Sequence, residues 1–165
     1  KRARTQNNCV SPLRIQGGFL IGENTMIRMA KEKDIPKIED LLSQVCLVHH
    51  KGRPDIFRFG SRKYTDSELE AILVDDNTPV FVAVDDNDVA QGHLFCHTRE
   101  SDGQGVIAKI KTMWIEDLCV DEKVRNSGIG TILFDAVEKF AKEQQMKMGM
   151  MFMNCLILMI IQLLE

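Results

Sequence analysis

Two glycines separated by one residue, Gly128 and Gly130, stand where a polar loop runs into a predicted helix. Glycine lets a backbone approach a ligand closely and adopt conformations that a Cβ hinders. The first turn of the helix also presents N–H groups without an intrahelical partner and the positive end of the helix dipole. The spacing therefore predicts a binding site for an anion, and a phosphate group suits it.

Three classes of phosphate-binding loop place glycines in this way, and the neighbouring residues distinguish them. A dinucleotide-binding fingerprint of the Rossmann type needs a third glycine where the chain has Leu133. A Walker A loop needs a lysine directly after its last glycine, but Thr131 follows Gly130. The remaining pattern, Arg-x-x-Gly-x-Gly, begins at Arg125 and resembles the pyrophosphate loop of the GNAT superfamily of N-acetyltransferases. An ordinary strand-to-helix turn with convenient glycines is the structural alternative.

The resemblance extends from Met26 to Gln144, and the segment from His50 to Asp66 is similar to one branch of the small bacterial members. It implies an α/β fold with a mixed sheet whose fourth and fifth strands splay apart. Acetyl-CoA is then the co-substrate, its pantetheine arm lies between those strands, and the acetyl group passes to a primary amine by direct attack. A non-catalytic CoA-binding or self-associating truncated domain of the same family is the alternative.

The resemblance also assigns cofactor contacts to the backbone around the glycines. The resemblance implies that the backbone of Leu118, Cys119 and Val120 hydrogen-bonds the acetyl carbonyl and the pantetheine. It also implies that the pyrophosphate is bound by backbone amides, those of Arg125, Asn126, Ser127, Gly128, Ile129, Gly130 and Thr131.

The implied reaction needs a base, because an ammonium ion has no lone pair with which to attack a thioester. An alkylamine has a pKa of about 10, so it is mostly protonated at neutral pH. Family members often place that base, or a substrate ligand, at the position of Glu116, and the backbone N–H of Leu118 would stabilise the oxyanion. Strand alternation predicts that Glu116 shares a sheet face with Trp114 and Leu118, while Asp117 points to the other face. A solvated carboxylate or an amine-binding anion is the alternative role of Glu116.

Arg53 and Asp55 are predicted to shape the acceptor pocket together with Glu116, although they could instead cap a loop. No metal site is predicted, because adjacent His49 and His50 point apart and the five cysteines lack a spacing typical of zinc ligands. The odd number of cysteines also indicates no disulfide framework, so a reducing cytoplasm is expected. A net charge of −3 argues against a nucleic-acid partner.

The elements that must position these residues follow from the hydrophobic pattern. Asp34 is predicted to cap a first helix, and Thr65 with Glu68 forms a capping box that opens a second. Residues 49–63, which lie between these helices, are predicted to be irregular. The remaining elements are strands at 27–30, 79–84, 89–98 and 107–120 and a helix at 129–144. This order, β-α-α-β-β-β-α, predicts one layered α/β domain at 26–145.

Both ends of the chain depart from this pattern. Residues 1–25 are predicted to be a non-native or disordered extension before a natural start at Met26. The resemblance stops after about Gln145, and six of the nine methionines lie beyond it, so we interpret residues 146–165 as an apolar tail produced by a frameshift. A true fifth strand with an apolar tail is one alternative. A membrane anchor is another, but the apolar run is shorter than the ~20 residues that a spanning helix needs. An unselected apolar tail would favour a homo-oligomer and an inactive chain.

Overall fold

The structure is a computed structural model that describes residues 19–20, 25–60, 62–106 and 108–150. Most of the predicted extension at 1–25 and of the predicted apolar tail at 146–165 lies outside these residues. A short piece of each is described, and each piece forms a strand of the same sheet.

A six-stranded mixed sheet forms the centre of the described chain, with the strands arranged in sequence order. The strands are β1 Phe19–Leu20, β2 Met26–Met29, β3 Val80–Val84, β4 Ala90–Glu100, β5 Lys111–Val120 and β6 Lys147–Met150. Each neighbouring pair from β1 to β5 is antiparallel, whereas β5 and β6 are parallel. The segment for which the sequence left both a shifted frame and a true strand open therefore starts as a strand.

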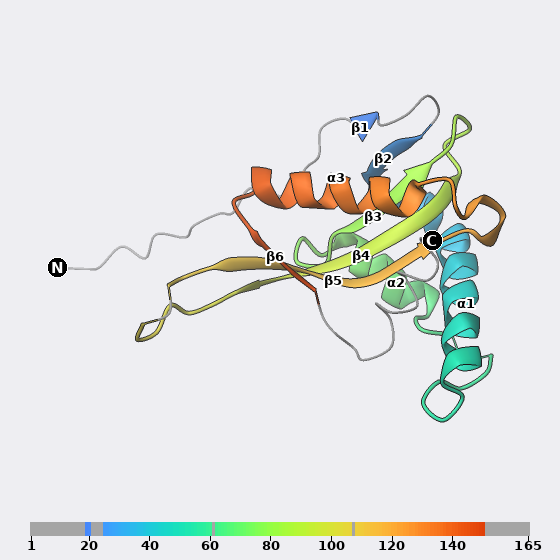
Figure 1. The fold of residues 1–165 in the computed structure, drawn as a ribbon, viewed down its shortest axis with the longest axis horizontal. Helices are drawn as coiled ribbons and strands as arrows, with labels where there is room; N and C mark the ends of the chain where they lie inside the picture. The colour runs from blue at the N-terminus through green and yellow to red at the C-terminus, as the bar shows by residue number, and fades with distance from the viewer. Residues whose placement is uncertain (1–18, 21–24, 61, 107, 151–165) are drawn as a thin grey trace.

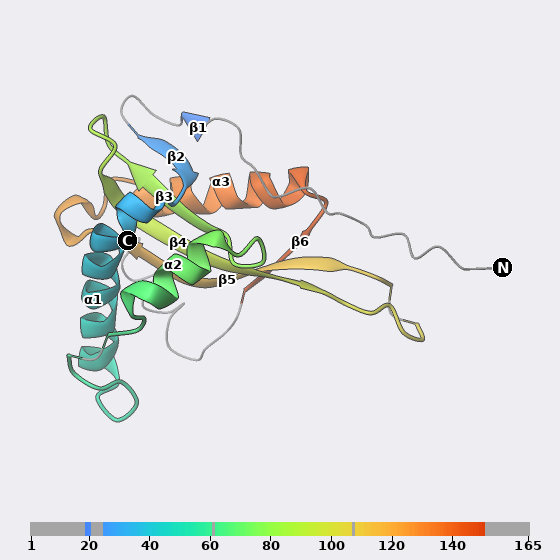
Figure 2. The ribbon, with the colours of Figure 1, turned by 180° about the vertical axis from the view of Figure 1, so that it is seen from behind.

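Helices cover both faces of this sheet (Figures 1 and 2). The helices are α1 Ile35–Gly52, α2 Asp66–Val74 and α3 Ile129–Glu143, and short 3-10 turns, η1 Glu32–Asp34 and η2 Glu122–Val124, lie before α1 and α3. One apolar core lies between the sheet and α3, and a second lies between the sheet and the pair α1 and α2. The predicted α/β class with a mixed sheet is confirmed.

The two predicted helix caps differ in outcome. The capping box at Thr65 is confirmed, because the Thr65 backbone N–H donates to a Glu68 carboxylate oxygen over 2.7 Å and the Thr65 hydroxyl accepts from the Glu68 N–H. Asp34 stands at the N-cap position of α1, as predicted, but its side chain makes no capping hydrogen bond. Its buried carboxylate instead accepts hydrogen bonds from the Arg28 guanidinium at 2.7 and 3.0 Å and from the Lys31 N–H. A buried guanidinium from β2 binds this carboxylate, and α1 starts without a side-chain cap.

Helix α1 continues through residues that the sequence predicted to be irregular, and it ends at Gly52. His49 is buried in its last turns, with its ring 4.9 Å from the ring of Phe57. The Nδ1 atom of His50 lies 2.7 Å from the Phe57 carbonyl oxygen. Contacts with the following loop thus extend the helix where the local pattern is polar. Strand β5 in turn begins at Lys111, later than predicted.

The pairing of β4 with β5 contains one irregularity, close to the end of β5. Cys96 pairs with Ile115 and the preceding Phe95 pairs with Asp117, so that Glu116 is an extra residue on β5. Such a β-bulge bends the strand and changes the face to which the next side chains along it point.

Candidate active site

The loop from β5 to α3 adopts the conformation that its glycines permit. After η2, Arg125 is extended, Asn126 has φ of 64° and Gly128 has φ of 83°. A Cβ on Gly128 would meet nothing within 4 Å. Glycine is therefore favoured here by the left-handed backbone rather than by crowding within the chain, and the space beside it stays open for a ligand.

The loop leads into the start of α3, where backbone N–H groups can act as hydrogen-bond donors to a ligand. Ile132 N–H donates to the Gly128 carbonyl oxygen over 3.0 Å, which is the first bond of the helix ladder. The preceding N–H groups of Ile129, Gly130 and Thr131 have no intrahelical acceptor. They lie at the positive end of a helix of 15 residues, so the predicted anion site has suitable donors.

Two side chains of the loop fold back on the loop itself. The Nε atom of Arg125 donates to the Val120 carbonyl oxygen over 3.2 Å, and the Ser127 hydroxyl donates to the Val124 carbonyl oxygen over 2.6 Å. These bonds hold the loop in shape from inside. The predicted contacts of Arg125 and Ser127 with an anion therefore rest on their backbone N–H groups.

The backbone N–H groups at the end of β5, next to this loop, alternate in direction. Asp121 N–H donates to the Gln91 carbonyl oxygen over 2.8 Å, and in an antiparallel ladder every second residue makes such bonds. The N–H group of Cys119 therefore points toward β4, whereas the N–H groups of Leu118 and Val120 point away from β4. Of the predicted backbone ligands on β5, Leu118 and Val120 are directed outward, and Cys119 is not.

Strand β6 lies on that outward side but does not reach Leu118 in the described chain. It pairs with β5 only from Thr112 to Ile115. The outward N–H of Leu118 thus lies beyond the last paired residue of β5. Among the described residues, no strand pairs with Leu118 on this side, and its oxyanion role stays a prediction.

The predicted faces of β5 need correction. Lys63 Nζ lies 2.8 Å from Asp117 Oδ2 and 3.8 Å from Glu116 Oε1, so both carboxylates face α1 and α2. Leu118 instead packs in the core under α3. Simple alternation fails here because the bulge adds Glu116 as an extra residue, which turns Asp117 and Leu118 over relative to the expected pattern.

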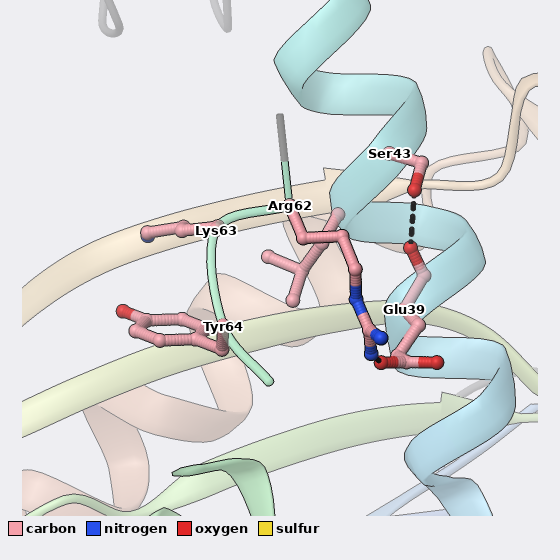
Figure 3. A pocket seen from close by; sticks show the side chains of 6 residues that line it. Glu39, Ser43, Arg62, Lys63 and Tyr64 are labelled. Carbon is pink, nitrogen blue, oxygen red and sulfur yellow. Dashed lines mark hydrogen bonds and ion pairs between the residues drawn. The ribbon is translucent and has the colours of Figure 1, made fainter. Parts of the chain in front are cut away.

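Two consecutive residues of the α1–α2 loop bind these two consecutive carboxylates. The Tyr64 hydroxyl donates to Glu116 Oε1 over 3.0 Å, and Lys63 binds Asp117. In Figure 3, both side chains extend from the loop away from α1, and the Tyr64 ring stacks on that of Phe95 with centroids 5.9 Å apart. Sequence analysis assigned neither residue a role, although both lie in the segment from His50 to Asp66 that resembles one branch of small acetyltransferases, because their partners are on a distant strand.

The two carboxylates differ in exposure. The side chain of Asp117 is 2% exposed, and that of Glu116 is 33% exposed. Although burial disfavours the ammonium form of Lys63, attraction by Asp117 and the hydrogen bond between them raise the pKa of Lys63 above its usual range. Lys63 therefore stays charged as the counterion of Asp117, while Glu116 can reach solvent and a substrate.

Two histidines of β4 lie near these carboxylates. His97 Nδ1 is 4.0 Å from Glu116 Oε2. His93 is completely buried, with its ring 5.0 Å from that of Phe95. Burial lowers the pKa of His93 to about 4, against a smaller attraction by Asp117, so its imidazole is neutral at physiological pH.

The other predicted substrate ligands, Arg53 and Asp55, lie elsewhere. They bind each other through hydrogen bonds of 2.9 and 2.7 Å beyond the C-terminal end of α1, in a loop that projects away from the sheet (Figures 1 and 2). Glu116 lies on β5 beside Tyr64. The structure therefore does not bring the three predicted acceptor ligands into one cluster.

A small hollow beside α1 is lined in part by Tyr64. Arg62 points back toward α1 and pairs with Glu39, as Figure 3 shows, and Ser43 lies on the same side. The hollow holds about 10 Å³, roughly the space for one water molecule. It is therefore too small to be an acceptor site.

Within the described ranges, no group of three or more His, Cys, Asp or Glu residues is placed to hold a metal ion. Among the same residues, no helix has the length and apolar character needed to cross a membrane.

Comparison with known proteins gives a consistent family. Residues 47–155 match the profile described as "Acetyltransferase (GNAT) family". A mutant of the BH1408 protein from Bacillus halodurans is 29% identical, with a TM-score of 0.71 over 78% of this chain and 82% of that one. A tetramutant of BH1408 is 31% identical, with a TM-score of 0.69 over 75% and 80% of the two chains. An acetyltransferase from Vibrio fischeri is 25% identical, with a TM-score of 0.62 over 75% and 93%. No curated protein matches the chain at a significant level.

The burial of His93 predicts an acid-sensitive fold. The unfolded chain takes up a proton below about pH 6.5, whereas folded His93 resists protonation down to a pKa of about 4. The free energy of unfolding should therefore fall as pH drops from about 6.5 to 4, by on the order of 3 kcal/mol from this residue. Urea unfolding of His93→Leu should show a correspondingly shallower pH dependence. Equal slopes for the parent and His93→Leu would refute this assignment.

The Lys63–Asp117 pair predicts an asymmetric effect on stability. Lys63→Met leaves the buried carboxylate of Asp117 without its cation and should lower the free energy of unfolding by about 3 kcal/mol. Adding Asp117→Asn removes the unpaired charge and should recover most of that loss. The exposed pair of Lys109 with Glu100 gives the matched control, since Lys109→Met should change stability by less than about 0.5 kcal/mol. A double variant as unstable as Lys63→Met would contradict the charge explanation.

Proposed function

The chain belongs to the Acetyltransferase (GNAT) family, and from this premise we propose that it transfers an acetyl group from acetyl-CoA to a primary amine by direct attack. One observation carries the proposal: the outward N–H of Leu118 lies on the same strand as the carboxylate of Glu116. Both precede the loop from β5 to α3, called the donor loop because it leads into the unpaired N–H groups at the start of α3. A donor for an oxyanion, a reachable carboxylate and an anion site thus lie close together along 116–131. This is the set of groups that acyl transfer to an amine needs.

The residues of the loop suit a diphosphate. Gly128 provides the left-handed turn, and the first N–H groups of α3 provide the donors. The backbone of Leu118 and Val120 would hold the acetyl and pantetheine part along the outward edge of β5. Bound acetyl-CoA supplies the activated thioester that the reaction consumes.

Glu116 would remove the proton from the substrate ammonium, either directly or through water. The free amine can then attack the thioester carbonyl carbon, whose oxygen would accept a hydrogen bond from the Leu118 N–H. The C–S bond breaks as the amide bond forms, and the departing thiolate takes up a proton. The hydrogen bond from the Tyr64 hydroxyl fixes one oxygen of Glu116 and leaves the other for this proton transfer.

Turnover of acetyl-CoA with a panel of primary amines tests the proposal, with the release of free thiol as the signal. Binding of acetyl-CoA without thiol release for any amine would contradict the enzymatic function and favour a CoA-binding domain.

The donor loop predicts a loss of cofactor affinity on substitution. Gly128→Ala with Gly130→Val strains the left-handed turn and adds bulk at the start of α3, so acetyl-CoA affinity should fall tenfold or more, about 1.4 kcal/mol. Isothermal titration calorimetry measures it. Gly105→Ala is the matched control, because Gly105 also has positive φ, 66°, but lies in the β4–β5 connection. Unchanged affinity in the double variant, with the fold intact, would refute the loop assignment.

The role of Glu116 predicts a pH-dependent loss of rate. Glu116→Gln keeps size and hydrogen bonding but removes basicity, so kcat should fall most at moderate pH and recover partly as higher pH supplies free amine. The pH–rate profile for thiol release measures this effect. Glu100→Gln, on the exposed end of β4, is the control. A Glu116→Gln profile that superimposes on that of the parent would show that Glu116 is not the base.

A further inference from the structure

A row of polar side chains on α1, here called the polar stripe, binds the beginning of the donor loop. Lys37, Asp40 and Gln44 are spaced so that they lie on one side of the helix. Lys37 Nζ donates to Asp40 at 2.8 Å and also to Asp121, and Gln44 Nε2 donates to Asp40 at 3.2 Å. The side-chain Oε1 atom of Gln44 accepts a hydrogen bond from the Glu122 N–H over 3.0 Å. The stripe therefore contacts the first two residues after β5 through both a charge and a backbone group.

Asp121 is fixed at this point from several directions. Its side chain is 4% exposed, its Oδ1 accepts the Lys123 N–H over 3.0 Å, and its own N–H donates to Gln91. Although burial disfavours a charged carboxylate, the hydrogen bonds from Lys37 and Lys123 hold the pKa of Asp121 below its usual range. A full negative charge therefore lies at the entrance of a loop whose donors suit an anion.

That charge opposes anion binding unless it is neutralised. Water and salt screen a buried charge poorly, so an uncompensated carboxylate at 121 would repel a diphosphate held a few residues further on. Lys37 binds this carboxylate. Although burial disfavours the ammonium form of Lys37, its hydrogen bonds to Asp121 and Asp40, together with their negative charges, raise the pKa of Lys37, so it is charged at neutral pH.

We propose that Lys37 is a positioning residue for cofactor binding, which neutralises Asp121 so that the loop can accept the diphosphate of acetyl-CoA. The inference rests on the proposed function. Lys37 touches neither reacting atom, and it acts through the charge of Asp121. Nothing in the local sequence marks Lys37, because its partner is 84 residues away.

Four proteins test this role by calorimetry with acetyl-CoA: the parent, Lys37→Met, Asp121→Asn and the double variant. Lys37→Met should bind at least tenfold more weakly. Asp121→Asn keeps an oxygen to cap η2 and loses the charge, so it should bind as tightly as the parent or more tightly. The double variant should return to within about threefold of the parent. Lys37→Arg keeps the charge and should also bind within about threefold.

Lys33→Met is the matched control, since Lys33 pairs with Asp88 on the β3–β4 turn and should leave affinity unchanged. A purely structural ion pair gives a different pattern, in which both single variants weaken binding alike and the double variant is no better. That pattern, or unchanged affinity in Lys37→Met, would overturn the inference. If Lys37→Met does not fold, weakened binding by Asp121→Asn overturns it instead. A parent that fails to bind acetyl-CoA overturns the proposed function itself, whereas a parent that binds separates the two ideas.

Discussion

The extra residue that Glu116 adds to β5 determines how the two faces of the sheet are used. Without it, strand alternation would place Asp117 under α3, among the apolar side chains of Leu133 and its neighbours. The bulge turns Asp117 toward Lys63 and leaves Leu118 to fill the core under α3. A buried carboxylate without a partner costs several kcal/mol, so this local shift in register makes the strand compatible with its sequence. It also brings a partly exposed carboxylate next to a buried one.

Three buried aspartates each form an ion pair with a cation on another element. Asp34 binds Arg28 of β2, Asp117 binds Lys63 of the α1–α2 loop, and Asp121 binds Lys37 of α1. Buried ion pairs add little net stability, because desolvation offsets their attraction, but breaking one is costly. Their effect is therefore to fix geometry. Each pair holds an element against the sheet in one arrangement, and the last two pairs set the two ends of the candidate site.

Features encoded by neighbouring residues could be predicted from the sequence. The capping box at Thr65 and the glycine loop need only contacts within a few residues, and both form as expected. Asp34 has the residue type and position of a cap, yet its carboxylate binds the guanidinium of Arg28 on the preceding strand β2. The side-chain faces after Glu116 could not be derived, because a bulge depends on the partner strand. Lys63 and Tyr64 were missed for the same reason, since their partners lie more than 50 residues away.

Strand β6 packs closely against the part of β5 that precedes the bulge. The described part of their pairing runs from Thr112 to Ile115, the residue before Glu116. The backbone of β6 lies directly on the Trp114 ring, because a Cβ on Gly149 would be 2.8 Å from its Cε3 atom. This close contact fixes β6 against the last regular part of β5. The bulge follows directly after this contact, and a bulge increases the bend and twist of its strand. The contact at Trp114 and the bulge at Glu116 are thus close together on β5, directly before the outward N–H groups of Leu118 and Val120.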